Sequence, residues 1–169
     1  MDTDFPRRLV LLRHAKSDWP EDVTDHDRPL AARGRRDAPL VGRWLARSGY
    51  APDAVICSTA SRAQQTWELA SAELPSRPLP RLEPRVYEAT VLGLLMLVRE
   101  ISDDLRTVAV VGHNPGLAEL AVGLAAPPPQ PPASFPTSAV AILGISGPWS
   151  SAGPGEAKLL AFAIPADMR

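Results

Sequence analysis

The chain has 169 residues, of which 45% are hydrophobic, and a formal net charge of −1. This length can bury a sizeable core, so we expect one globular domain over residues 1–169, and the near-neutral charge argues against broad affinity for nucleic acid. No apolar run reaches the roughly 20 residues that span a bilayer, and the first residues do not form a secretory signal, so we expect a cytoplasmic protein.

The first third of the chain alternates predicted strands and helices. The leucine-rich segment Arg8–Leu12 predicts a strand, and a polar surface loop follows over Ser17–Pro29. Apolar residues at helical spacing predict a helix around Leu40–Leu45, and Pro39 leaves the start of this helix undecided. Ala54–Cys57 predicts the second strand.

The middle of the chain continues this alternation. Ser61 with Gln64 resembles a capping box and predicts a helix that runs to about Glu73. Leu79–Leu82 predicts a short strand, and the continuous apolar spacing of Val91–Ile101 predicts a well-buried helix.

The third firm strand is predicted over Thr107–Val111, and a short helix over Leu117–Leu124, with Pro115 near its first turn. The proline-rich stretch Ala126–Ala133 can continue neither a helix nor a sheet, so it predicts an extended connector. This connector is too short to separate two domains.

The last part of the chain predicts two strands, Ala139–Ile145 and Lys158–Ile164, which the loop Ser146–Gly155 joins as an antiparallel addition at the sheet edge. The whole pattern therefore predicts an α/β fold. We expect a mostly parallel central sheet with helices on both faces, an antiparallel edge strand, and ligands at the carboxyl ends of the strands.

Two of the three histidines directly follow predicted strands. His14 comes after the first strand with Arg13 beside it, and His113 comes after the third. Arg62 stands where the second strand gives way to a helix, and Arg28 lies near the end of the polar loop. Because the carboxyl ends of parallel strands meet at one edge, these side chains can share one crevice. Guanidinium groups and helix-end amides suit phosphate, so the sequence predicts a phosphate pocket.

A pair of histidines in a phosphate pocket suggests phosphoryl transfer. One neutral imidazole can attack phosphorus to form a phosphohistidine intermediate, while the other donates to the oxygens or stabilises the departing group. Glu88 is the best carboxylate candidate for protonating a leaving oxygen, and its alternative role is to cap the helix near Val91. A histidine after a strand also has an alternative, since most such residues are only hydrogen-bonded structural groups.

Four further residues have less specific patterns. Ser17 and Asn114 either donate to phosphate or shape their turns, and His26 lies in an acidic stretch and is expected on the surface. Cys57 is the only cysteine, which excludes an internal disulfide, and its apolar strand predicts a small buried thiol. We expect no metal and no nucleotide cofactor, because the spacings of such sites are absent.

Five segments match a known family in its order and span nearly the whole chain. They are Leu11–Ser17, Asp27–Leu30 with Arg33 and Gly34, Cys57 and Ser58 with Arg62–Thr66, Tyr87–Ala89, and Val111–Gly116. With these segments the chain resembles the histidine phosphatase superfamily, and within it the compact branch of SixA-type phosphohistidine phosphatases.

The resemblance implies a role for each pocket residue. His14 would be the nucleophile, Arg13 and Arg62 would clamp the phosphoryl group, His113 would complete the pocket, and Arg28 would be a further phosphate or substrate contact. It also implies a phosphoglycerate-mutase-like fold without large insertions, and such an open site would admit a protein surface.

Three functions remain open from the sequence. The leading hypothesis is a phosphatase that removes phosphate from phosphohistidine in a signalling protein, without cofactor. The second is a phosphatase of small phosphomonoesters, and the third is a catalytically silent phosphoprotein-binding module. All three need a phosphate-bearing partner, and none involves nucleic acid or a membrane.

Overall fold

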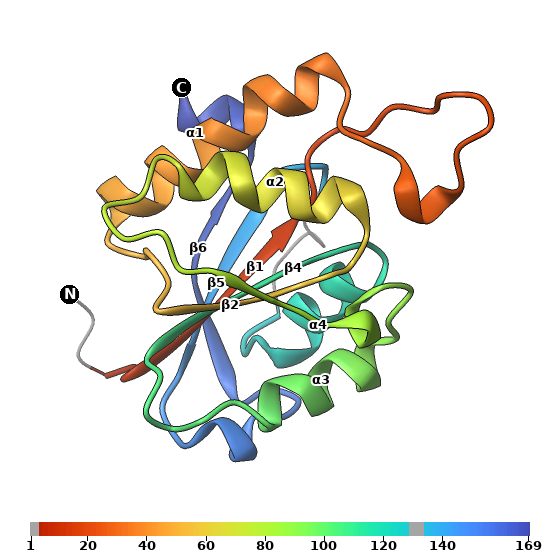
Figure 1. Ribbon diagram of the computed structural model, residues 1–169. Helices are drawn as coiled ribbons and strands as arrows, with labels where there is room; N and C mark the ends of the chain where they lie inside the picture. Colours follow the sequence, from red (N-terminus) through yellow and green to blue (C-terminus); the bar gives the residue numbers. More distant parts are fainter. Residues whose placement is uncertain (1–3, 129–133) are drawn as a thin grey trace.

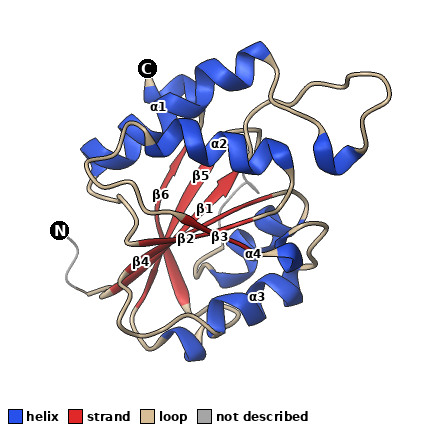
Figure 2. Cartoon of the chain, viewed as in Figure 1, coloured by secondary structure: helices blue, strands red, loops and turns tan. Residues whose placement is uncertain are grey.

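The computed structural model describes residues 4–128 and 134–169, and a six-stranded sheet in the order β3-β2-β4-β1-β5-β6 forms its centre (Figures 1 and 2). The strands are β1 Arg7–Arg13, β2 Ala54–Cys57, β3 Pro80–Leu82, β4 Thr107–Gly112, β5 Val140–Ile145 and β6 Ala157–Ala163. The helices are α1 Ala32–Ser48, α2 Ser61–Ser71, α3 Val91–Arg99 and α4 Gly116–Leu124.

The strand directions confirm the predicted fold class. β3, β2, β4 and β1 pair in parallel, whereas β5 runs antiparallel to β1 and β6 runs antiparallel to β5. The parallel strands need long crossovers, which helices provide, while the β5–β6 pair needs only the predicted loop. The carboxyl ends of β1, β2 and β4 therefore meet at one edge of the sheet.

Helices α1 and α2 cover one face of the sheet and α3 and α4 cover the other (Figure 2), so successive residues of β1 are buried on alternate faces. Leu9 and Leu11 pack into the cluster that contains α3 and α4, whereas Val10 and Leu12 pack into the cluster that contains α1 and α2. All four side chains are fully buried. Each contributes about 1.5–3 kcal/mol relative to an exposed position, so both layers are held firmly against the sheet.

The helix that the sequence left without a clear start begins at Ala32, and Pro39 lies inside it. Gly34, in its first turn, lies so close to the chain after β1 that a Cβ atom there would overlap the carbonyl oxygen of Lys16. A glycine therefore lets α1 approach the segment that follows His14. Gly49 ends the helix in a left-handed conformation.

The predicted capping box at the start of α2 is wrong. The N-cap is Ala60, and its amide donates to the Ser58 hydroxyl at 3.1 Å. The Gln64 side chain instead donates to the Thr59 carbonyl at 2.7 Å. The helix also ends at Ser71, before the predicted Glu73.

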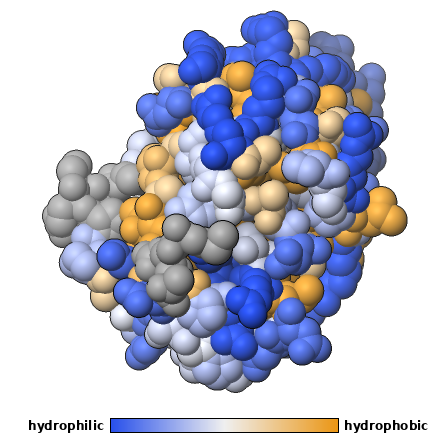
Figure 3. All heavy atoms as spheres, turned by 90° about the vertical axis from the view of Figure 1, so that its left-hand side faces the viewer, coloured by the Kyte–Doolittle hydropathy of each residue, from blue (hydrophilic) through white to orange (hydrophobic). Residues whose placement is uncertain are grey.

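The bounds of the other predicted elements agree with the structure to within a few residues. The prediction that the helix over Val91–Ile101 is well buried is wrong, because α3 buries one face and leaves Leu92 and Met96 exposed. Of the proline-rich connector, residues 129–133 lie outside the described residues. Within residues 4–128 and 134–169, no helix combines the length and apolar character needed to cross a membrane. The side of the molecule where β1 begins shows mostly hydrophilic residues with separate hydrophobic patches (Figure 3).

Candidate active site

The two strand-end histidines come together at the carboxyl edge of the sheet. His14 follows β1 and His113 follows the neighbouring β4, so the parallel pairing of these strands brings them side by side. Their ring centroids lie 5.1 Å apart, and the ring planes are inclined by 52°. The structure thus joins residues that are almost one hundred positions apart in the sequence, as the strand-end argument predicts.

The surroundings of His14 select one ring nitrogen for chemistry. Nδ1 lies 2.8 Å from the carbonyl oxygen of Ala15, which can only accept, so Nδ1 carries the proton and Nε2 keeps its lone pair. The side chain is buried, and this burial above all lowers the pKa of His14 to about 3, with smaller contributions from His113, Arg62 and Arg13. The ring is therefore neutral at pH 7, as a nucleophile must be.

The main chain around His14 is held from two sides. The amide of Ala15 donates to the hydroxyl of Thr66 on α2 at 2.9 Å. The amide of Ser138 donates to the carbonyls of both Arg13 and His14 at 3.1 Å. Thr66 and Ser138 are both fully buried, so these bonds fix the ring in one position.

His113 is oriented by Ser58, which follows β2, the strand between β1 and β4 in the sequence. Its Nε2 lies 2.8 Å from the hydroxyl of Ser58, which itself accepts the amide proton of Ala60. The Ser58 hydroxyl can then donate to Nε2, which leaves the ring proton on Nδ1. Burial and then Arg62 lower the pKa of His113 to about 4. Its Nδ1 is buried and meets no hydrogen-bond partner among the residues described.

Arg13 and Arg62 are held in the same manner. Nη1 of Arg13 donates to the carbonyl of Phe135 at 3.1 Å, and Nη1 of Arg62 donates to the carbonyl of Asp25 at 2.6 Å. Nε of each is buried, and the described part of the chain offers neither of them an acceptor. Burial and the neighbouring Arg62 lower the pKa of Arg13. Two guanidinium groups, Arg62 buried and Arg13 half-buried, therefore present free Nε–H groups that suit an anion.

Asp25, which the sequence did not single out, links the arginines. Its carboxylate accepts from Nη2 of Arg62 and from Nε of Arg28, both at 3.1 Å, and from the Tyr87 hydroxyl at 2.5 Å. The Tyr87 hydrogen bond is the largest cause that lowers the pKa of Asp25 to about 2, ahead of the two arginines. Asp25 occupies the Nη1–Nη2 edge of Arg62 and leaves the Nε side free for an anion.

Arg28 reaches the site through Asp25. Its side chain is buried, its Nε is engaged by the Asp25 carboxylate, and Nη1 donates to the carbonyl of Asp18 at 3.4 Å. The Trp19 ring lies over its guanidinium, with 3.4 Å between Cζ and the ring centroid. A direct phosphate contact by Arg28 stays a prediction.

His26 lies at the surface, as predicted, with 40% of its side chain exposed, but it also contacts residues around the site. Its Nε2 lies 2.8 Å from the Thr59 hydroxyl, and its ring meets the Tyr87 ring edge-on at 4.8 Å. The Tyr87 ring in turn meets His113 at 5.6 Å, so all three histidines of the chain lie around one site. No periodicity could have shown this, because the contacts join two loops.

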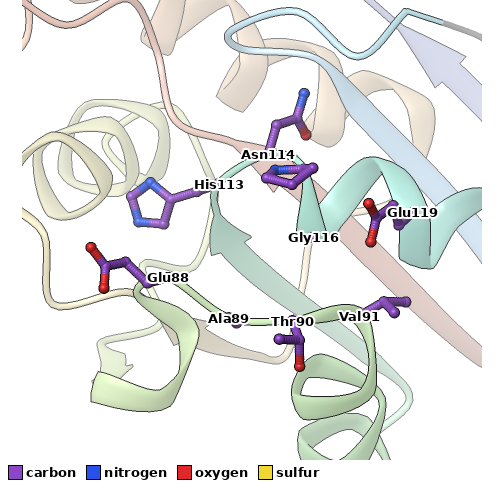
Figure 4. A pocket seen from close by; sticks show the side chains of 9 residues that line it. Glu88, Ala89, Thr90, Val91, His113, Asn114, Gly116 and Glu119 are labelled. Carbon is purple, nitrogen blue, oxygen red and sulfur yellow. The ribbon is translucent and has the colours of Figure 1, made fainter.

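Glu88 and Asn114 lie beside His113 and line a cavity of about 460 Å³ with it. Figure 4 shows the exposed Glu88 side chain on the same side of the cavity as the His113 ring, with Glu119 at the other end on α4. The Asn114 amide donates to the carbonyl of Phe135 at 2.7 Å, the same acceptor that holds Arg13. The cavity thus adjoins the anion site.

Ser17 is buried and pairs through its backbone with Leu30. No contact within residues 4–128 and 134–169 connects its hydroxyl with the histidines. In the same ranges, three non-glycine residues adopt a left-handed φ, namely Asp22 (62°), Glu88 (57°) and Ser138 (64°). All three belong to the segments around the site, where backbone strain is typically retained for function.

A pair of neutral imidazoles framed by guanidinium N–H groups defines the class of site, because this arrangement can bind an oxyanion beside the free lone pair of a buried imidazole. The sequence profile of the histidine phosphatase superfamily (branch 1) matches residues 9–91. An uncharacterized protein of Mycobacterium tuberculosis is 40% identical over 161 residues, which cover 91% of this chain and 99% of that protein.

Solved structures agree with this match. A candidate phosphohistidine phosphatase SixA from Nakamurella multipartitia is 31% identical, with a TM-score of 0.81 over 94% of this chain and 96% of its own. Another, from Agrobacterium tumefaciens, is 28% identical, with a TM-score of 0.79 over 95% and 100%. The chain belongs to the histidine phosphatase superfamily, within its SixA-type branch, and it has that fold without large insertions.

Proposed function

We propose that this protein is a phosphatase that works through a phosphohistidine at His14, and that its substrate is phosphohistidine in a signalling protein. One observation carries the proposal: a buried, neutral His14 whose Nε2 keeps its lone pair lies beside His113, with 5.1 Å between the two ring centroids. Around this pair, Nε of Arg13, Nε of Arg62 and Nδ1 of His113 are buried nitrogens without a partner in the described ranges.

In the first step, Nε2 of His14 attacks phosphorus. The P–Nε2 bond forms as the bond from phosphorus to the leaving group breaks, and the equatorial oxygens gain charge. Arg13, Arg62 and His113 supply the N–H groups that stabilise this charge. These donors are already fixed by Phe135, Asp25 and Ser58, so little reorganisation accompanies the step.

Glu88 is proposed to donate the proton that a leaving oxygen needs, because it lines the cavity next to His113. A leaving imidazole nitrogen needs less help. In the second step, water attacks the phosphohistidine, Glu88 takes its proton, and the P–Nε2 bond breaks to release inorganic phosphate and neutral His14. Arg28, Ser17 and Asn114 are proposed to contact phosphate or the substrate at the rim.

The choice of a protein substrate is supported by the names of the similar structures, which call those proteins phosphohistidine phosphatases. The absence of large insertions relative to them supports an open site. A phosphatase of small phosphomonoesters would use the same residues. It is the second candidate, and the cavity beside Glu88 is the observation that favours it.

The test compares turnover of a phosphohistidine-containing protein with that of sugar phosphates and p-nitrophenyl phosphate. We expect the highest kcat/KM for the protein, and a strong preference for a small ester would establish the second candidate instead. A rapid-quench experiment should trap a phosphorylated enzyme that His14→Ala does not form. Binding of the substrate without any adduct would instead identify a silent binding module.

A further inference from the structure

The loop between β1 and α1 has an unusual charge. Its segment 18–27, here called the acidic loop, carries five carboxylates and no lysine or arginine, namely Asp18, Glu21, Asp22, Asp25 and Asp27. All five residues are exposed. Asp25 is paired with Arg28 and Arg62, whereas Asp18, Glu21 and Asp22 form no ion pair with any residue that the structure describes.

The acidic loop also presents an aromatic side chain. Trp19 is 73% exposed although one face of its ring is stacked on the guanidinium of Arg28. This stacking holds the ring in place and leaves its other face open to solvent. A tryptophan that is held in place while most of its surface stays exposed is a typical anchor for a protein partner, because little conformational freedom is lost on binding.

A continuous series of contacts connects this anchor with the anion site. Trp19 stacks on Arg28, the Nε of Arg28 binds Asp25, and Asp25 binds the Nη groups of Arg62. In Figure 1 the loop extends from the body next to the start of α2, the helix that carries Arg62. A partner seated on Trp19 therefore lies beside the phosphoryl group that Arg62 is proposed to hold.

We propose that the acidic loop is the docking element for a basic segment of the substrate protein next to its phosphorylated side chain. This inference rests on the proposed function and specifies the chemistry of its substrate. Arginines at the base of the site attract the phosphoryl dianion, whereas the carboxylates at the rim repel ligands with further negative charge. The combination favours a phosphoryl group on a cationic surface over an anionic metabolite.

The test uses two fluorescent phosphohistidine peptides that differ only in the flanking residues, lysine and arginine in one and glutamate in the other. Binding is measured by anisotropy in the His14→Ala background, so that the phosphoryl group stays on the peptide. We expect the basic peptide to bind about tenfold more tightly, with this preference shrinking to about threefold or less when Glu21→Gln and Asp22→Asn are added, or in high salt. Trp19→Ala should weaken the binding of the basic peptide by about tenfold.

Two matched controls separate docking from general effects. Leu79→Ala removes a 91% exposed apolar side chain from another surface, and Glu156→Gln removes an exposed charge outside the loop, so both should keep the preference. Equal affinities for the two peptides, or a preference that survives the loop substitutions, would overturn the proposal. Melting temperatures of all variants show that each one is folded.

The outcomes also separate this inference from the proposed function. Phosphate release from the same peptides by the wild-type protein reports the activity. If both peptides are hydrolysed with equal kcat/KM and bind equally, the docking role is wrong and the phosphatase proposal stands. If the basic peptide binds preferentially but neither is hydrolysed, the docking role stands and the phosphohistidine substrate is wrong.

Discussion

The base of the site and its wall are built in different ways. The base consists of strand ends, where His14 and Ser58 are buried and His113 and Arg13 are half-buried, and where hydrogen bonds to the main chain and to the Ser58 hydroxyl fix these groups. The wall consists of loops, in which Asp25 and its partners are joined by side-chain ion pairs and ring contacts at a partly exposed surface. The base therefore presents the reacting group, while the wall positions what surrounds it.

The two regions also control protonation by different means. In the base, burial lowers the pKa of His14 to about 3 and that of His113 to about 4. In the wall, hydrogen bonds and charge pairing lower the pKa of Asp25 to about 2. Burial keeps an imidazole neutral, so that its lone pair stays available, whereas hydrogen bonds and ion pairs keep a carboxylate ionised. Each prediction below tests one side of this contrast.

The largest expected effect comes from His14, the proposed nucleophile in the base. His14→Ala should lower kcat for p-nitrophenyl phosphate by about 10⁴-fold or more, because no other group replaces a covalent nucleophile. His26→Ala removes a histidine from the wall and is the matched control, with an expected loss of about tenfold or less. Steady-state kinetics of both variants measure the difference. Equal losses would show that His14 has no special role.

A smaller effect is expected from the acid that organises the wall. Asp25→Ala removes the shared partner of Arg28, Arg62 and Tyr87, and hydrogen bonds to charged groups contribute about 1.5–3 kcal/mol. The resulting drop in kcat/KM should be about 10- to 100-fold, mainly through KM, because Arg62 loses its fixed orientation. Asp103→Ala, which breaks an exposed ion pair with Arg7, is the control.

An unchanged KM in Asp25→Ala would mean that Arg62 keeps its position without the carboxylate. Restoration of most of the activity by Asp25→Asn would show that hydrogen bonding rather than charge holds the guanidinium. Asp25→Asn also removes a negative charge beside the anion site, so its affinity for free phosphate or vanadate should differ from that of the wild type. Isothermal titration with vanadate measures that change.

The same contrast explains what the sequence could predict. His14, His113 and Arg62 were predictable because each follows an apolar strand, and parallel strands deliver their carboxyl ends to one place. Asp25 and His26 were not, because their partners Tyr87 and Thr59 lie in loops whose paths no periodicity encodes.

Local errors have similar causes. The capping box at Ser61 was wrong because the N-cap is Ala60, one residue earlier, and the Gln64 side chain donates to the Thr59 carbonyl instead. The start of α1 was undecided because Pro39 fits either a first turn or a kink, and it lies inside the helix. Only the close approach to Lys16 explains Gly34 in the first turn. Propensity describes the isolated helix, while tertiary contact decides its ends.

A third prediction separates the two regions by pH. The pKa of His14 is lower in the folded protein than in the unfolded chain, so the unfolded chain binds more protons below pH 6.5 and stability falls as the pH falls. Between pH 7.5 and 4.5 this loss should be about 2–3 kcal/mol for His14, and His113 should add to it. His14→Gln should therefore flatten the curve in this range.

Asp25 affects stability over a lower pH range than His14, and its ionised form is negative. Its folded pKa of about 2 lies below the unfolded value, so its stabilisation is present above pH 4 and is lost between pH 4 and 2. Asp25→Asn should flatten only that lower range. Urea unfolding at a series of pH values measures both variants, and a His14→Gln curve parallel to the wild type would contradict the burial argument.

The smallest effect is expected from Cys57, which lies next to Ser58 but on the other side of the sheet. Successive strand residues point to opposite faces, so Ser58 meets His113 while Cys57 packs into the core below α1 and α2. Burial raises the pKa of the thiol to about 12, so it is not a nucleophile in the folded protein.

Cys57→Ala should therefore change kcat by less than about twofold and lower the free energy of unfolding by about 1 kcal/mol. Native protein should also resist iodoacetamide until it is unfolded. Rapid labelling of the native thiol, or a large loss of kcat at unchanged stability, would show that Cys57 takes part in the reaction and not only in core packing.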